Sequence, residues 1–181
     1  MSFEIWAAIL GLAVIVPGVL LFNRLVSDRN QARQGYADID VQLKRRADLV
    51  PRLVEVVKGY AAYEKAVLTG VTELRAAALG ARDVDERFAQ ERALGAGLKR
   101  LVVLQEAYPQ LKADANFRDL QAKLVEVEDQ LQYARRFYNG AVKQYVTRLE
   151  SFPDVIVASL FRFQPMPFFD TEERASVRVS L

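Results

Sequence analysis

The chain contains neither cysteine nor histidine among its 181 residues. Without cysteine it can form no disulfide, carry no thiolate nucleophile or zinc–cysteine site, and accept no lipid on an N-terminal cysteine. Without histidine it lacks the commonest general base and the commonest ligand of transition metals. The sequence also shows no glycine-rich phosphate loop. We therefore expect a protein that is not an enzyme and that has no metal site and no cofactor.

An excess of charge of either sign is also missing. Lysine and arginine number 25 and aspartate and glutamate number 23, which gives a net charge of +2. Such a balance provides no extended basic surface, so we expect no nucleic acid among the partners. Charged residues make up 27% and hydrophobic residues 51% of the chain, a composition typical of a folded protein rather than a disordered one.

One long hydrophobic run is present, at the N-terminus. The segment Ile5–Phe22 carries no charge, and as a helix it would span ~27 Å, against a hydrocarbon core of roughly 30 Å. Trp6 and Phe22 lie near its ends, where aromatic side chains suit the membrane interface. A cleaved signal peptide is the alternative, but no basic residue precedes the run and no A-x-A site follows it. We expect a retained transmembrane helix.

Basic residues follow this run and none precedes it. Arg24, Arg29 and Arg33 come soon after Phe22, and a further basic run occupies residues 44–46. Because cytoplasmic flanks are enriched in lysine and arginine, this asymmetry predicts a single-pass protein with its N-terminus outside and its body in the cytoplasm.

An apolar seam begins at Tyr36. Steps of alternately three and four residues reach Tyr36, Ile39, Leu43, Arg46, Val50, Leu53, Val57, Tyr60, Glu64, Val67, Val71, Leu74 and Ala78. A 3.5-residue period of this length predicts a long helix in left-handed supercoiled packing, which Pro51 bends without ending. Arg46 and Glu64 are the only charged positions, and each is expected to have a partner or to reach water, because an isolated buried charge is costly.

Two further helices and a short fourth are expected. A break at Gly80–Asp83 precedes a looser helix that ends at Tyr108, and a second clear seam runs from Phe117 to Arg148. Capping-box spacing at residues 151–154 introduces a short apolar helix from Val155 to about Phe163. The pattern predicts an all-α, antiparallel helical bundle with an N-terminal transmembrane helix. Its segments are an anchor at 1–22, a long-helix bundle at 23–151, and a short apolar helix and C-terminal tail at 152–181.

Four blocks of this sequence resemble the LemA family. The first, DIDVQLKRRADLVP at residues 38–51, is similar to the family's signature, and VKGYA follows at 57–61. ARRFYN at 134–139 and Phe152-Pro153 are similar to its C-terminal blocks. The resemblance implies a bacterial membrane protein with an N-terminal anchor, a helical-bundle domain and no established enzymatic activity. Some relatives look like lipoproteins, so an extracytoplasmic bundle is the alternative to the cytoplasmic one.

Helix lengths suggest self-association. The first seam has 43 residues, or ~64 Å, whereas the second helix has only about 25 residues, or ~37 Å. The early part of the seam is therefore expected to lack a partner within one chain, and a second copy of the chain is its simplest cover. The candidate self-association seam consists of Tyr36, Ile39, Leu43 and Val50.

Phenylalanines gather near the C-terminus. They either close one end of the bundle or form an exposed docking patch, whose candidate members are Phe161, Phe163, Phe168 and Phe169. Three functions follow from the whole sequence. The first is a membrane-tethered scaffold that binds other proteins or itself. The second is a lipid- or envelope-remodelling factor whose aromatic segment touches the bilayer. A hydrolytic enzyme is the third and the least favoured, because we find no catalytic motif in the sequence that supports it.

Overall fold

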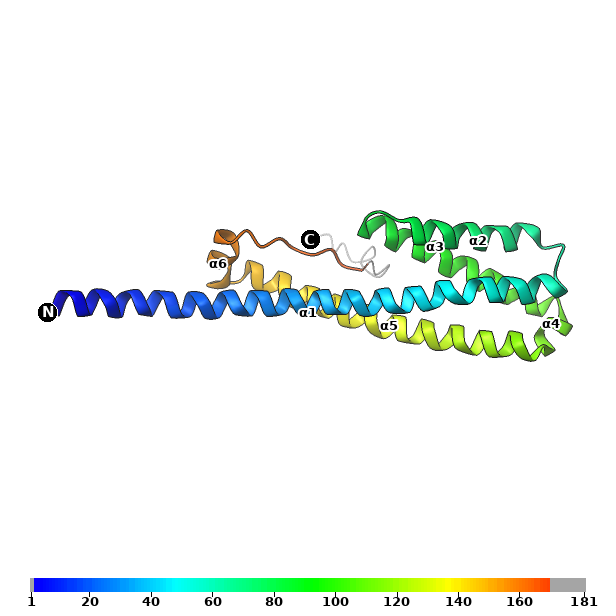
Figure 1. Cartoon of the computed structure of the whole chain (residues 1–181), viewed down its shortest axis with the longest axis horizontal. Coiled ribbons are helices and arrows are strands. Elements are labelled where there is room, and N and C mark those ends of the chain that lie inside the picture. The colour runs from blue at the N-terminus through cyan, green and yellow to red at the C-terminus, as the bar shows by residue number, and fades with distance from the viewer. Residues whose placement is uncertain (1, 170–181) are drawn as a thin grey trace, which may run out of the picture. The chain divides into compact units, whose positions relative to one another are not determined.

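The computed structural model describes residues 2–169, and every regular element in that range is a helix (Figure 1). The elements are α1 (Ser2–Tyr60), α2 (Lys65–Gly80), α3 (Val84–Val103), the 3₁₀ helix η1 (Leu104–Glu106), α4 (Pro109–Ala113), α5 (Ala115–Glu150) and α6 (Asp154–Leu160). The all-α prediction is confirmed. The tail predicted at residues 170–181 lies outside the described residues.

The chain divides into two compact units. One, here the terminal unit, comprises Met1–Ala37 with Ala134–Leu181, and the other, the inner unit, comprises Asp38–Tyr133. Helices α1 and α5 each contribute one part to the terminal unit and the other part to the inner unit. The predicted segment boundaries after residues 22 and 151 therefore do not separate these units.

Several helices of the inner unit contribute to a shared apolar core. Its buried members are Val50, Leu53 and Val57 of α1, Leu68, Val71 and Ala78 of α2, Leu94, Leu98 and Leu101 of α3, Leu111 of α4, and Phe117, Leu120 and Leu124 of α5, with Ala61 from the α1–α2 connection. The positions on α1 and α5 belong to the apolar seams of the sequence. Periodicity therefore identified the core-facing side of both helices correctly.

Helices α2 and α3 form a tight hairpin (Figure 1). The break predicted at Gly80–Asp83 is present, and the Asp83 side chain caps α3 by accepting a hydrogen bond of 2.8 Å from the Glu86 backbone N–H. Gly97 lies where the two helices approach closely, because a Cβ there would come within 2.9 Å of Leu74. The small residue thus allows the hairpin to close.

The sequence predicted one long helix for the first seam, and this prediction is wrong. Helix α1 continues through Pro51 but ends at Tyr60, and α2 starts at Lys65. The heptad pattern crosses this break because Val57 on α1 and Val71 on α2 face the same core. Glu64, which seemed a charge within a seam, instead precedes α2 and accepts a hydrogen bond of 3.0 Å from the Tyr108 hydroxyl. The charged residue in the seam therefore lies at the break between α1 and α2.

The early seam is covered by the chain itself. Ile39, Leu43 and Val50 are buried, and Tyr36 is half-buried with its ring 6.0 Å from that of Tyr138. The prediction that these residues lack a partner within one chain is wrong. It depended on a 43-residue first helix paired with a second helix of only about 25 residues, whereas the 36-residue α5 also packs against α1. A homo-oligomer stays a prediction, but this seam no longer provides a reason for it.

The terminal unit is built from both ends of the chain. Leu25 of α1 and Val157 and Ala158 of α6 form its small apolar cluster, against which Leu21, Phe22, Leu149 and Phe163 pack. Helices α1 and α5 come close at Gly35, where an added Cβ would lie 3.0 Å from both the Phe137 ring and the Tyr138 Cα. The Tyr138 backbone cannot move away from an added methyl group at Gly35 as easily as a flexible side chain could.

Alanine at Gly35 should therefore destabilise the protein. We expect Gly35→Ala to lower the free energy of unfolding by about 1–3 kcal/mol, because α1 and α5 must separate. Gly140→Ala is the matched control: no atom lies within 4 Å of its Cβ position, so it should stabilise the helix by about 1 kcal/mol. Unfolding followed by circular dichroism in mild detergent measures both. Equal effects of the two substitutions would contradict the close approach.

The first part of α1 has almost no packing partners. Within the described residues, one helix is long and apolar enough to cross a membrane, judged by length and composition, and it is α1. Its most apolar 18-residue window has a mean hydropathy of 2.2 and is only 6% buried. The exposed apolar side chains include Trp6, Ile9, Leu10, Leu12, Ile15, Val16, Val19 and Leu20. Burial begins at Leu25, without a break in the helix.

Candidate functional site

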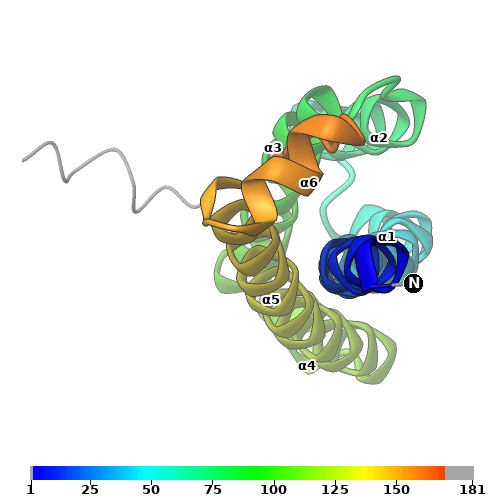
Figure 2. The same ribbon diagram turned by 90° about the vertical axis from the view of Figure 1, so that its left-hand side faces the viewer.

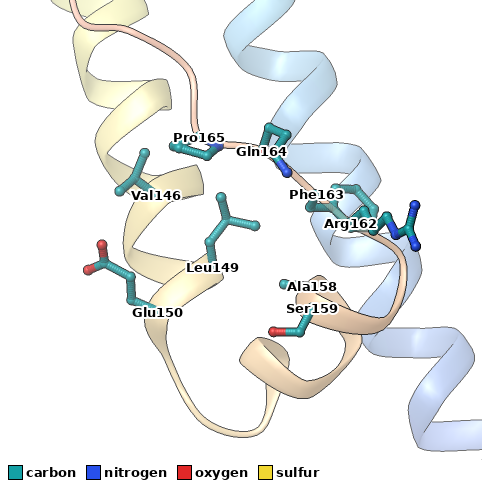
Figure 3. Close-up of a pocket in the computed structure, with 9 residues that line it drawn as sticks. All are labelled: Val146, Leu149, Glu150, Ala158, Ser159, Arg162, Phe163, Gln164 and Pro165. Carbon is teal, nitrogen blue, oxygen red and sulfur yellow. The ribbon is translucent and has the colours of Figure 1, made fainter.

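The segment Phe161–Phe169, here the C-terminal strap, turns back from the end of α6 (Figures 1 and 3). Arg162 has a φ of 55°, in the left-handed region. The Phe163 N–H then donates 2.9 Å to the Ala158 carbonyl, and the Arg162 N–H donates 3.3 Å to the Ser159 carbonyl. This pair of bonds is a Schellman motif, in which glycine is the usual residue at the left-handed position.

Two tyrosines of α5 hold the backbone of the strap. The Tyr145 hydroxyl donates 3.0 Å to the Gln164 carbonyl, and the Tyr138 hydroxyl donates 2.6 Å to the Pro167 carbonyl. The tyrosines are seven residues apart and therefore lie on the same face of α5. Burial raises the pKa of Tyr145 above its ordinary value, so its hydroxyl remains a protonated donor even in alkaline solution.

Asn139 binds the end of the strap at two points. Its amide nitrogen donates 2.9 Å to the Phe169 carbonyl, and its amide oxygen accepts 2.8 Å from the Phe169 N–H. The Phe169 ring is buried, and the Arg135 guanidinium lies 4.5 Å from its centroid. Sequence reasoning missed this role, although the block at 134–139 was singled out. The adjacent Tyr138-Asn139 pair was the available signal.

The predicted docking patch is not one exposed surface. Phe169 is buried, Phe163 and Phe168 are half-buried, and Phe161 alone of the four is exposed. Phe163 packs on the terminal core, with the Arg29 guanidinium 5.0 Å from its ring centroid. Phe163 and Phe169 therefore pack within the terminal unit, and the closing of one end of a bundle stays a prediction.

Helix α6 leaves an apolar face uncovered in the described structure. The exposed apolar side chains of α6 and of the residues that flank it are Phe152, Ile156, Leu160 and Phe161. The predicted capping box does not form: the Ser151 hydroxyl donates 2.6 Å to the Thr147 carbonyl, and no side-chain bond caps α6. The helix is thus held by its buried side rather than by a cap.

A pocket of about 370 Å³ lies between α5, α6 and the strap (Figure 3). It is lined by Val146, Leu149, Glu150, Ala158, Ser159, Arg162, Phe163, Gln164 and Pro165. Figure 3 shows the Glu150 carboxylate and the Arg162 guanidinium on opposite sides, pointing away from each other. These charged groups do not converge, so the pocket offers no acid–base pair.

An ion-pair network joins α1 to α5 in the terminal unit. Asp28, which is buried, accepts hydrogen bonds of 2.5 Å from Arg148 Nε and 3.0 Å from Gln144 Nε2. Arg148 Nη1 also lies 3.9 Å from Asp154 at the start of α6. Arg148 ended the second clear seam of the sequence, and its charge has a structural partner.

Arg46 is the buried cation of the inner unit. It pairs with the Glu91 carboxylate of α3, donates 2.8 Å to the Glu91 carbonyl, and donates 2.9 Å to Glu128 of α5. Arg46 and Glu91 are each 1% exposed. Gly95 leaves room for the guanidinium, since a Cβ there would lie 3.3 Å from Nη1. The expectation that Arg46 has a partner is confirmed.

The acidic residues of the sequence mostly have structural roles. Asp40 pairs with Arg87, and Glu128 pairs with Arg46. Asp114 accepts 2.8 Å bonds from the Phe117 N–H and the Tyr60 hydroxyl, and both bonds lower its pKa. Among the described residues, no group of three or more acidic side chains is placed to hold a metal ion.

Three curated relatives are magnetosome proteins at low identity. Magnetosome protein MamQ 2 and Magnetosome protein MamQ 1 of Paramagnetospirillum magneticum are each 20% identical over 183 residues, which cover 87% of this chain and 67% of the relative. Magnetosome protein MamQ of Magnetospirillum gryphiswaldense is 20% identical over 189 residues, or 90% of this chain and 70% of the relative. At this identity a shared specific role does not follow.

A family model covers most of the chain. It matches residues 35–181, a range that includes the inner unit, the C-terminal part of α5, α6 and the strap. The family-like blocks at 38–51 and 134–139 lie inside the matched range. The first block contains Arg46, whose contacts lie within the inner unit, and the second contains Tyr138 and Asn139, whose contacts lie within the terminal unit. The chain belongs to the LemA family.

Proposed function

We propose that the protein is a membrane-anchored helical scaffold without catalytic activity, whose inner unit binds other proteins or further copies of the chain. The start of α1 crosses the bacterial cell membrane, and the inner unit and the rest of the terminal unit lie on the cytoplasmic side. The helices of the inner unit pack as an antiparallel bundle. The charge asymmetry around the apolar run supports the orientation.

The observation that carries this proposal is the change of environment along α1. Residues from Ile9 to Leu20 expose apolar side chains, and Leu25, a few residues further on, is fully buried in the terminal core. The helix has no break between the two stretches. The proposed span is therefore continuous with the terminal unit, so the anchor is a rigid part of that unit rather than a flexible tether.

The described polar groups support binding rather than catalysis. Arg46, Asp28 and Asn139 are each engaged in contacts that join helices or hold the strap. A catalytic residue needs its reactive atoms directed at a space where substrate can sit. The pocket beside the strap has no such arrangement among the residues that line it.

The side of the membrane can be tested with a single cysteine. Tyr63 is 94% exposed in the α1–α2 connection, and the native chain has no cysteine. We expect a Tyr63→Cys variant to resist a membrane-impermeant maleimide in intact spheroplasts and to react in inside-out vesicles. Reaction in intact spheroplasts would place the inner unit outside the cytoplasm, which is the arrangement that lipoprotein-like relatives suggest.

The scaffold role can be tested by crosslinking in living cells. A photoreactive amino acid at Tyr63 or at exposed Val103 samples the inner unit without disturbing its core. We expect a small, reproducible set of crosslinked proteins that depends on the position of the probe, and crosslinks between identical peptides if the chain self-associates. Crosslinks that are the same at every position would contradict a specific binding surface.

A further inference from the structure

Helix α6 and the residues that flank it expose apolar side chains. Phe152, Ile156 and Leu160 follow one another at intervals of four residues and are 81%, 59% and 74% exposed, and Phe161 beside them is 57% exposed. Val157 and Ala158 of α6 are buried. These four exposed side chains are here the α6 apolar face. An apolar cluster of this kind on a short helix marks a contact surface.

The α6 apolar face lies beside the end of the uncharged run on α1. The Phe161 ring lies 4.8 Å from the Phe22 ring, and the Phe163 ring lies 5.6 Å from it. Phe22 is the last residue of the uncharged run that is proposed to cross the membrane. Within the terminal unit, α6 lies beside α1 (Figures 1 and 2), and the first residues of α1 extend beyond α6 (Figure 1).

Two arginines lie close in the sequence to the aromatic contact between Phe22 and Phe161. Arg24 follows Phe22 by two residues, Arg162 directly follows Phe161, and both side chains are exposed. Arginine guanidinium groups bind phosphate in bidentate fashion, and apolar side chains beside them suit the boundary between headgroups and acyl chains. The combination of an apolar face, a basic rim and the end of a membrane span fits lipid better than it fits a second protein.

We propose that the α6 apolar face inserts into the bilayer interface from which α1 emerges, with Arg24 and Arg162 against anionic headgroups. The terminal unit is then attached to one leaflet at two points, the span and α6, which fixes its orientation on the membrane. This inference rests on the proposed anchor. It supplies the structural basis for the lipid-contacting role that the aromatic C-terminal segment suggested.

Depth-dependent quenching in lipid nanodiscs tests this contact on the full-length protein. Single cysteines at Ile156, at exposed Phe137 on α5 and at Leu12 in the proposed span each carry an environment-sensitive fluorophore. The nanodiscs contain anionic lipid and nitroxide lipids of two kinds, one with the nitroxide just below the headgroup to quench Ile156, and one with the nitroxide near the end of the acyl chain to quench Leu12, which lies ~15 Å along α1 from Phe22. Phe137 is the matched control, because it is an exposed apolar residue of the same unit, about 20 Å along α5 from its end.

We expect the label at Ile156 to be quenched several-fold more than the label at Phe137, and the label at Leu12 to be quenched as well. Quenching at Leu12 with no excess at Ile156 would overturn the α6 contact and leave the anchor intact. Loss of quenching at both Leu12 and Ile156 would overturn the anchor too. A blue-shifted but unquenched label at Ile156 would mean that protein covers the face, which also overturns the proposal.

Discussion

Arg46→Met should lower the free energy of unfolding by about 3–5 kcal/mol, because it leaves the Glu91 carboxylate buried without its cation. The side chain of Glu91 is 2% exposed, so water cannot replace the lost partner, whereas Glu128 is open enough to be hydrated. Thermal unfolding in mild detergent, followed by circular dichroism, should show a decrease in Tm of roughly 10 °C.

Two controls separate the ion pair from a general loss of arginine. Arg45→Met changes the exposed neighbour and should alter stability by less than about 0.5 kcal/mol. The double variant Arg46→Met/Glu91→Leu should recover most of the loss, because an apolar pair of similar volume often replaces a buried ion pair without cost. Such a recovery would mean that the ion pair specifies which helices pack together and adds little net stability. If the double variant is instead as unstable as Arg46→Met alone, the ion pair itself stabilises the fold.

Asn139→Leu should release the C-terminal strap without unfolding the helices. The variant removes both hydrogen bonds to Phe169, at about 1 kcal/mol each, which corresponds to a roughly 30-fold larger equilibrium constant for opening of the strap. Hydrogen exchange followed by mass spectrometry should show faster exchange in peptides that contain residues 161–169. Peptides from the inner unit should exchange as in the wild type.

Lys143→Leu is the matched control for this experiment. Lys143 lies on α5 one turn beyond Asn139, and its side chain is exposed. The substitution should leave exchange in the strap unchanged. Equal protection of the strap in Asn139→Leu and the wild type would show that the tyrosine contacts at Gln164 and Pro167 hold it alone.

The parts of the fold that sequence predicted are those with local periodicity. The uncharged run to Phe22, the seam of α5 and the break after Gly80 each follow from spacing within one element. The reversal at residues 61–64 was missed because the seam keeps its register across it. Two helices that face one core can show the same heptad pattern as one long helix.

The contacts that sequence could not predict join distant residues. Arg46 is 45 residues from Glu91 and 82 from Glu128, and no periodicity specifies such pairs. The strap was missed for a different reason. Tyr138, Asn139 and Tyr145 bind its main-chain atoms, and hydrogen bonds to main-chain atoms leave no pattern in the side chains of residues 164–169.

A cysteine-accessibility scan along α1 tests most directly whether its start crosses a membrane and continues unbroken into the terminal unit. Single cysteines at positions 9–31 of the full-length protein, in sealed membranes, would be exposed to a water-soluble maleimide on both sides. Positions 9–20 should be unreactive. From Asn23 onward, exposed positions should react, and Leu25 and Asp28 should not, with the period of a helix. Labelling of positions 9–20 as fast as that of Asn23 would contradict the account.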